Sequence, residues 1–172
     1  MRTKLLTTFL LMFALSIFAR TAQAQNSDHK FHSVFILNFI KYIQWPSVSS
    51  DFVIGVLGDA DIIAELERSS QNKNVAGQKI IIKKYDNIND FNGECHVFYI
   101  PNGKSKHLAD ALTKTSGKST LIITEKNGLA SKGSGINFVL KDGRWKFELN
   151  KEATEKAGLK VSSDLAKLAI LI

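Results

Sequence analysis

The amino-acid sequence predicts a single α/β domain with a mainly parallel central sheet, flanking helices and a C-terminal β-hairpin. Short, mostly apolar runs alternate with segments of helical character; they lie at residues 52–57, 79–83, 97–100 and 119–124. Strands that are buried on both faces of a parallel sheet have this unbroken apolar composition. Asp142-Gly143 then separates two further strands, and this dipeptide is typical of a two-residue hairpin turn.

The first 24 residues have the three parts of a secretory signal peptide. Arg2 and Lys4 form a basic start, residues 5–15 are mostly apolar, and Ala22-Gln23-Ala24 is a small-residue cleavage motif. The apolar run is shorter than the ~20 residues that cross a bilayer. We therefore expect cleavage after about Ala24, and a mature chain of residues 25–172 that is exported to the periplasm and does not span the membrane.

The charge of the mature chain is lower than that of the whole sequence. The formal net charge is +7, but three basic residues leave with the signal peptide, so 20 basic and 16 acidic residues remain, a net charge of +4. These charges do not form the basic stripe interleaved with aromatic residues that nucleic-acid binding requires. The sequence therefore predicts no nucleic-acid partner.

The first predicted helix, residues 29–44, has apolar side chains on nearly every side and ends at Trp45-Pro46. An ordinary surface helix carries one apolar stripe opposite a polar face. Such a helix is either deeply buried or presents an apolar side to another molecule. We therefore expect a partner or homodimer interface that includes Phe35, Phe39, Tyr42 and Trp45, although Trp45 fits a core position equally well.

Further elements follow along the chain. A helix is expected from Ile62 to Ser69 or Ser70, another over residues 105–115, and the hairpin strands at residues 136–140 and 145–149. Two short helices close the sequence. The first is capped by Asn150 and ends at Gly158; the second is capped by Ser162 or Ser163 and has Leu165, Leu168, Ala169 and Ile172 at core spacing.

Two loops have the position of a ligand-binding loop. Gly58-Asp59 follows the first strand, where open α/β sheets bind ligands, although a plain turn with a helix cap has the same composition. Residues 101–105 resemble a phosphate-binding loop but lack its earlier glycine. Residues 101–105 are therefore expected to be an ordinary turn, and Gly58 and Asp59 remain candidate ligand contacts.

The titratable residues do not form a recognisable catalytic or metal site. His29 and His32 are three residues apart but lack a third ligand at matching spacing, so we expect incidental surface histidines. His107 has Asp110 one turn later without a nucleophile motif. The sequence therefore predicts no catalytic residue, no cofactor and no metal, and a protein that is not an enzyme.

Cys95 is the one cysteine of the chain. A lone thiol cannot form an internal disulfide, so the fold must depend on its hydrophobic core. Cys95 directly precedes an apolar run, and adjacent strand residues point to opposite faces, so His96 is not expected to activate it. We expect a buried, inert thiol.

Several motifs in order along the chain resemble the YfiR family of periplasmic proteins. They are Asn38-Phe39-Ile40-Lys41-Tyr42-Ile43-Gln44-Trp45-Pro46, Val56-Leu57-Gly58-Asp59, Cys95-His96-Val97-Phe98-Tyr99-Ile100, Gly135-Ile136-Asn137-Phe138, Phe147-Glu148-Leu149-Asn150, Ala157-Gly158-Leu159-Lys160-Val161-Ser162-Ser163 and residues 165–169. The likeness covers essentially the whole mature chain.

This resemblance implies a small, often dimeric α/β domain that represses a membrane-bound diguanylate cyclase by binding its periplasmic sensor region. Cyclic-di-GMP and biofilm formation are then restrained. Related domains stand at the front of sensor kinases, which implies a sensor kinase as the other possible kind of partner. The best-known member uses disulfides, whereas Cys95 has no partner, so redox control by an internal bridge is not expected. A periplasmic small-ligand receptor is the alternative function.

Overall fold

The computed structural model describes residues 28–46, 50–58 and 61–172. The predicted signal peptide, residues 1–24, and the predicted ligand contact Asp59 lie outside these residues. Within the described ranges, no helix has both the length and the apolar composition needed to cross a membrane.

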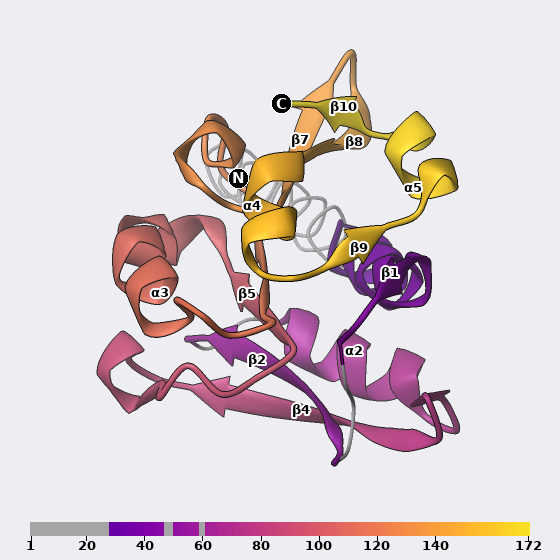
Figure 1. Cartoon of the computed structure of the whole chain (residues 1–172), viewed down its shortest axis with the longest axis vertical. Helices are drawn as coiled ribbons and strands as arrows, with labels where there is room; N and C mark the ends of the chain where they lie inside the picture. The colour runs from indigo at the N-terminus through magenta and orange to yellow at the C-terminus, as the bar shows by residue number, and fades with distance from the viewer. Residues whose placement is uncertain (1–27, 47–49, 59–60) are drawn as a thin grey trace, which may run out of the picture.

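A curled, mostly parallel sheet of eight strands lies at the centre of the fold and confirms the predicted fold class (Figure 1). Its spatial order is β10-β8-β7-β6-β5-β2-β4-β3, with antiparallel pairing at β7–β8 and β3–β4. The strands are β2 (Phe52–Leu57), β3 (Asn74–Val75), β4 (Gln78–Tyr85), β5 (Val97–Ile100), β6 (Leu121–Thr124), β7 (Ile136–Lys141), β8 (Arg144–Leu149) and β10 (Ile170–Leu171). A separate antiparallel pair joins β1 (Ile43–Gln44) to β9 (Lys160–Val161).

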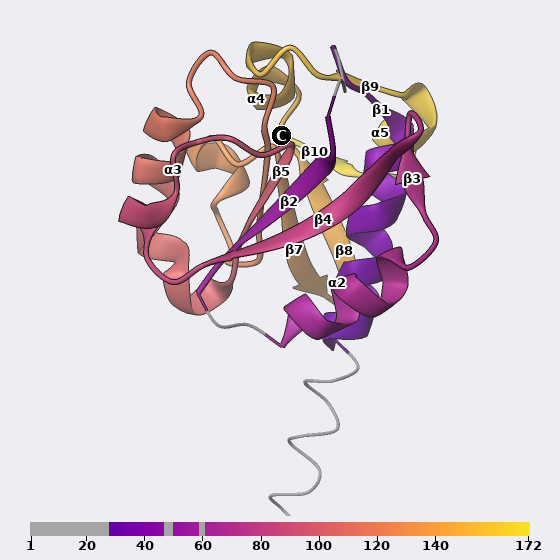
Figure 2. The ribbon, with the colours of Figure 1, turned by 90° about the horizontal axis from the view of Figure 1, so that it is seen from below.

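Helices cover both faces of the sheet (Figure 2). The opening helix, residues 28–42, and α2 (Ile62–Ser70) pack on one face, and α3 (Leu108–Lys114) packs on the other. Strand β5 contributes to both cores, because Val97 and Tyr99 point to the opening helix whereas Phe98 and Ile100 point to α3. The apolar runs of β2, β5 and β6 are therefore strands buried on both sides, whereas the run in β4 is partly exposed, with Ile81 40% exposed.

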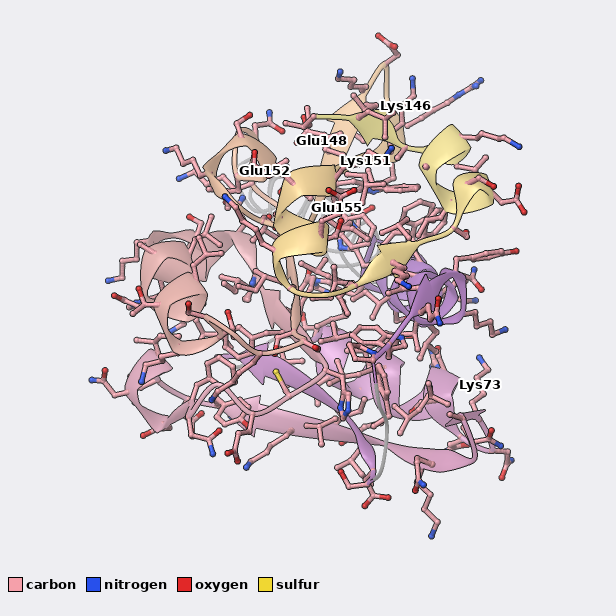
Figure 3. The ribbon with its side chains drawn as sticks, in the orientation of Figure 1. Lys73, Lys146, Glu148, Lys151, Glu152 and Glu155 are labelled. Carbon is pink, nitrogen blue, oxygen red and sulfur yellow. The ribbon has the colours of Figure 1, made fainter. Side chains whose placement is uncertain are left out.

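Short elements complete the chain. These are the 3₁₀ helices η1 (Ile88–Asp90), η2 (Asn102–His107) and η3 (Ala130–Lys132), and the helices α4 (Lys151–Lys156) and α5 (Ser163–Leu168). The Asn150 side chain accepts a hydrogen bond from Ala153 N at 2.9 Å, and Ser162 Oγ accepts one from Leu165 N at 3.2 Å. Both predicted caps are thereby confirmed. Glu152 and Glu155 of α4 point to solvent (Figure 3).

The predicted β-hairpin is present as β7 and β8. Asp142 and Gly143 both have positive φ values, 54° and 69°, as the tight two-residue turn requires. Trp145, Phe147 and Leu149 face the opening helix, and the alternate residues of β8 face away from it. The hairpin therefore closes the core on the side of the opening helix.

The prediction for the C-terminus was wrong in one respect. The last helix ends at Leu168, whose side chain is 74% exposed, and Ile170–Leu171 forms an edge strand parallel to β8. Ile172 N donates to Leu149 O at 3.0 Å. Pairing with β8 gives the last backbone groups hydrogen-bond partners, which one more helical turn would not have provided. Of the predicted core residues of this helix, Leu165 is the one that is buried.

Candidate functional site

The carboxyl ends of the parallel strands contain a switch in chain direction. From β2 the chain passes to β4 on one side, and β5 then pairs with β2 on the other side. Open α/β sheets bind ligands at such switch points. Gly58, a predicted ligand contact, follows β2 with a φ of +82°, and a Cβ atom there would lie 2.8 Å from Cε of Lys104 in η2. A side chain at position 58 would therefore displace the flexible end of Lys104, and the positive φ disfavours any residue other than glycine there.

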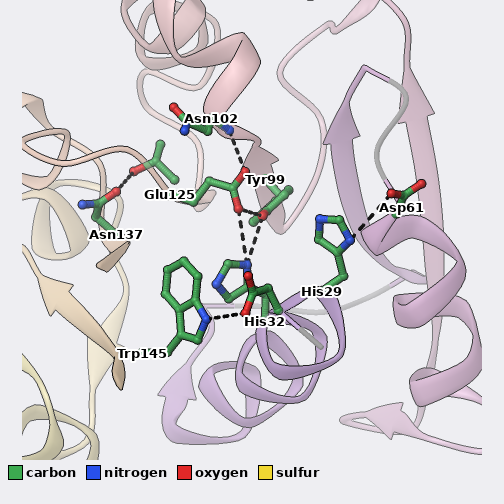
Figure 4. A network of polar contacts seen from close by, with 10 residues as sticks. His29, His32, Asp61, Tyr99, Asn102, Glu125, Asn137 and Trp145 are labelled. Atoms are coloured by element: carbon green, nitrogen blue, oxygen red, sulfur yellow. Dashed lines mark hydrogen bonds and ion pairs between the residues drawn. The ribbon is translucent and has the colours of Figure 1, made fainter. Parts of the chain in front are cut away.

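A buried polar network lies at this same edge of the sheet (Figure 4). Tyr99 OH donates to Glu125 Oε2 at 2.5 Å, and Asn102 N donates to Glu125 Oε1 at 2.7 Å. His32 Nδ1 is 3.3 Å from Glu125 Oε2 and 3.4 Å from Tyr99 OH. We call these four residues the His32 network. The opening helix, β5, the start of η2 and the residue that follows β6 each contribute one member.

Aromatic rings enclose His32 within the core. Its exposed fraction is 1%, its ring stacks on Phe138 with centroids 4.1 Å apart, and the Trp145 ring approaches it edge-on at 4.5 Å. Trp145 Nε1 in turn donates to Asp28 Oδ1 at 2.7 Å. These contacts fix the first turns of the opening helix to the hairpin and to the edge of the sheet.

The network shifts the pKa values of two of its groups. Burial by itself raises the pKa of Glu125, but the hydrogen bonds from His32, Tyr99 and Asn102 N, together with the electrostatic interaction with His32, outweigh it and bring that pKa below 4.5. Burial and the adjacent Glu125 carboxylate raise the pKa of Tyr99 well above 10.0. The folded protein therefore favours an ionised glutamate beside a neutral tyrosine.

A second polar cluster continues from β6 toward the hairpin. Thr124 Oγ1 lies 2.7 Å from Asn137 Oδ1, and Asn137 Nδ2 donates to Glu148 Oε2 at 2.9 Å. Thr124 and Asn137 are both fully buried. This cluster satisfies polar groups between β6, β7 and β8, and so has a structural role.

The prediction that His32 is a surface histidine was wrong. The i, i+3 spacing with His29 indicates neighbours on one helix face, but it cannot show that Glu125 and Tyr99 come to that face from remote strands. His29 is different: its ring is 21% exposed and its Nδ1 is 3.9 Å from Asp61 Oδ2. Among the described residues, no three His, Cys, Asp or Glu side chains are arranged to hold a metal ion.

The predicted interface residues have different environments. Phe39 is 1% exposed and belongs to the core, whereas Tyr42 is 46% exposed. Phe35 and Trp45 are half-buried: Phe35 stacks on Phe31, and Trp45 packs edge-on against Phe52 with its Nε1 donating to Ile40 O at 3.2 Å. The structure therefore leaves Tyr42 as the most accessible of the four, and the interface itself stays a prediction.

The remaining candidate residues occupy ordinary structural positions. Cys95 is half-buried rather than buried as predicted, although burial of its thiol raises the pKa of Cys95 to about 12. His96 Nδ1 accepts a hydrogen bond from Val53 N at 3.0 Å, so that nitrogen stabilises the backbone of β2. His107 and Asp110 form an exposed contact of 3.4 Å on α3. The loop after β5 folds into η2, the turn that was expected there.

Comparisons with known proteins identify relatives by sequence and by fold. A family model described as YfiR/HmsC-like matches residues 29–170. A solved structure of a conserved domain protein from Vibrio cholerae O1 biovar El Tor strain N16961 has 12% sequence identity and a TM-score of 0.56, and the match covers 83% of this chain and 59% of that one. This chain therefore spans less than two thirds of that protein, and the likeness shows the fold alone. No curated protein matches.

Proposed function

The chain belongs to the YfiR/HmsC-like family, and we propose that it is a non-catalytic regulator of the periplasm. It binds and represses a membrane signalling protein, namely a diguanylate cyclase, and thereby restrains cyclic-di-GMP and biofilm formation. The observation that carries this proposal is the extent of the family match, because residues 29–170 include almost all of the described domain. The family is regulatory rather than catalytic.

Tyr42 is the residue of the opening helix best placed to contact this partner. Its side chain is 46% exposed, although its backbone is held by a 2.9 Å hydrogen bond from Ser162 N to Tyr42 O. A tyrosine fixed in this way adds contact area at little cost in conformational entropy. Phe35 and Trp45 border the core and would contribute their exposed edges.

Deletion and complementation in the source bacterium test the regulatory proposal. Deleting the gene should raise cyclic-di-GMP and biofilm mass, because the cyclase loses its repressor, and the wild-type gene should restore both. Unchanged cyclic-di-GMP in the deletion strain would contradict repression. Lower cyclic-di-GMP would instead mean that the protein activates its partner.

A matched pair of variants tests the role of Tyr42. Tyr42→Ala should weaken co-purification with the membrane cyclase and fail to restore repression, whereas Leu168→Ala serves as the control because Leu168 is also an exposed apolar residue, on α5. Both variants should keep the wild-type circular-dichroism spectrum. Equal co-purification of the two variants would remove Tyr42 from the interface.

One observation favours a second candidate, a small-ligand receptor. His32 Nε2 is buried and has no hydrogen-bond partner within the described residues, and the other ring nitrogen of His32 lies 3.3 Å from Glu125 at the carboxyl edge of the sheet. A buried polar atom of this kind normally has a partner. A thermal-shift screen of small polar metabolites tests this candidate, because a ligand of the folded state raises Tm. A flat result would reject it.

A further inference from the structure

A groove lies between the end of the opening helix and the edge strand β3. Its volume is about 380 Å³, and it is lined by Ile40, Lys41, Ile43, Trp45, Asn74, Val75 and Ala76. Figure 2 shows β1 and β3 side by side at this place. Ile40 and Ile43 are buried and form an apolar floor, whereas Trp45 and Val75 are half-buried. The groove can therefore accept a large apolar side chain.

The wall formed by β3 is preorganised. Ala76 and Gly77 connect β3 to β4 with positive φ values of 51° and 83°, the geometry of a tight hairpin turn. β3 is the last strand in the sheet order and pairs only with β4 among the described strands. The outer backbone groups of such an edge strand are available to an extended segment of another chain.

Exposed lysines lie in this groove and next to it. Lys41 lines the groove. Lys73 precedes the lining residue Asn74 and Lys79 pairs with Asn74 across the β3–β4 ladder, and both line the adjacent hollow. Lys160 pairs with Gln44 in the β1–β9 ladder. All four are exposed and have no ion pair or hydrogen bond to another described side chain. Figure 3 shows Lys73 at this side of the molecule.

The two hollows hold more lysines than acidic residues. Among the described residues, no acidic side chain lines the groove, and Glu67 lines the adjacent hollow with Lys73 and Lys79. A partner with a basic or neutral surface would have no favourable electrostatic interaction with these lysines. A partner with acidic side chains on either side of an apolar one would complement them. The apolar floor disfavours a purely electrostatic partner.

We propose that this groove binds an extended, acidic segment of a partner protein, with one large apolar side chain inserted beside Trp45. The proposal deepens the proposed function and rests on it for the partner's identity, the periplasmic region of a membrane signalling protein. Tryptophan at such a position is a frequent binding hot spot. The lysines supply selectivity and a binding rate that falls with salt.

A peptide library tests the groove without the membrane partner. The purified chain is immobilised and panned against random dodecapeptides on phage, and one enriched peptide is labelled for affinity measurement. We expect enriched peptides to carry Asp or Glu on both sides of Trp, Phe or Leu. Their affinity should fall at least about tenfold in the double variant Lys73→Glu/Lys79→Glu, and should decrease as salt is added.

The double variant Lys106→Glu/Lys132→Glu is the control. It makes the same change in net charge at exposed lysines of η2 and η3 that line neither the groove nor the adjacent hollow, and should leave the affinity unchanged. All four lysines are exposed, so both variants should melt like the wild type. Equal loss in both variants, enrichment of peptides without acidic residues, or no enrichment would overturn the proposal.

The oligomeric state tests whether a second copy of the chain occupies the groove instead of a partner protein. If sedimentation shows a wild-type dimer that Lys73→Glu/Lys79→Glu dissociates, the groove binds a second copy of the chain and the proposal is overturned. If acidic peptides bind the groove but gene deletion does not change cyclic-di-GMP, the groove proposal is supported and the proposed function is contradicted. The two proposals can therefore fail separately.

Discussion

The two ends of the opening helix differ in how they are held. At its start, His32 is enclosed by Phe138 and Trp145 and contacts Glu125 and Tyr99. At its end, Tyr42 is 46% exposed, and the neighbouring residues Lys41 and Ile43 line the groove beside β3. One end is therefore fixed by buried polar contacts, whereas the other leaves Tyr42 accessible to solvent. The difference shows that apolar composition alone does not locate an interface.

Phe39, between the two ends, should give the largest loss of stability. Its ring lies 4.8 Å from that of Phe147 and 5.7 Å from that of Phe138, and it is 1% exposed. Phe39→Ala should lower the free energy of unfolding by about 3–5 kcal/mol, because it leaves a cavity in the core. Urea denaturation measures this, with the half-buried Phe35→Ala as the milder control. Equal losses would mean that the helix is less firmly docked than its burial indicates.

Glu125 should give the next largest effect and tests the fixed end directly. Glu125→Ala leaves Tyr99 OH and His32 Nδ1 without their carboxylate partner, and should cost about 3 kcal/mol. Glu152→Ala is the control, since that carboxylate contacts Lys156 in solvent and its loss should leave the unfolding midpoint unchanged. If Glu125→Ala unfolds at the wild-type urea concentration, the His32 network does not fix the helix.

The same end of the helix should make stability depend on pH. The pKa of Glu125 is lowered by folding, so its contribution is complete above 4.5 and is lost as the pH falls through the folded value. The pKa of Tyr99 is raised, so its contribution is complete below 10.0 and is lost at more alkaline pH. As the pH is lowered through the acid range, the free energy of unfolding should decrease less steeply in Glu125→Gln than in the wild type. An identical slope would assign the acid dependence to other groups.

Tyr42, at the exposed end, should give the smallest change in stability. Tyr42→Ala removes a side chain with nearly half its surface in solvent, and should lower the free energy of unfolding by about 0.5–1 kcal/mol. The same urea denaturation measures it. A loss as large as that of Phe39→Ala would place Tyr42 in the core and erase the contrast between the two ends.

Much of the fold could be predicted because it depends on local patterns. The strand at Phe52–Leu57, the helix at Ile62–Ser70 and the hairpin around Asp142-Gly143 were all predicted from apolar runs and turn residues. The two-residue strands β1, β3, β9 and β10 were missed, because such strands exist only through their partners. Leu168 was assigned to the core for the same reason: helical spacing does not show where the chain leaves the helix.

The site could be predicted only in part. The sequence placed Gly58 at the carboxyl edge of the sheet, but the His32 network joins residues up to 93 positions apart, and no local signal marks Glu125 or Tyr99. The opening helix was recognised as unusually apolar, yet the side covered by the sheet could not be distinguished from the side left open. Only packing against Phe138, Phe147 and Trp145 decides that.

The sequence alone determined the α/β class, most element boundaries, the hairpin turn, the two helix caps and the family resemblance, because backbone conformation and hydrophobic period act over a few neighbouring residues. The tertiary structure decided that His32 is buried, that Phe39 is covered while Tyr42 is exposed, and that Lys41 of the opening helix lines one groove with residues of β3. Burial and charge at these positions depend on strands that are remote in the chain, and only folding brings those strands together.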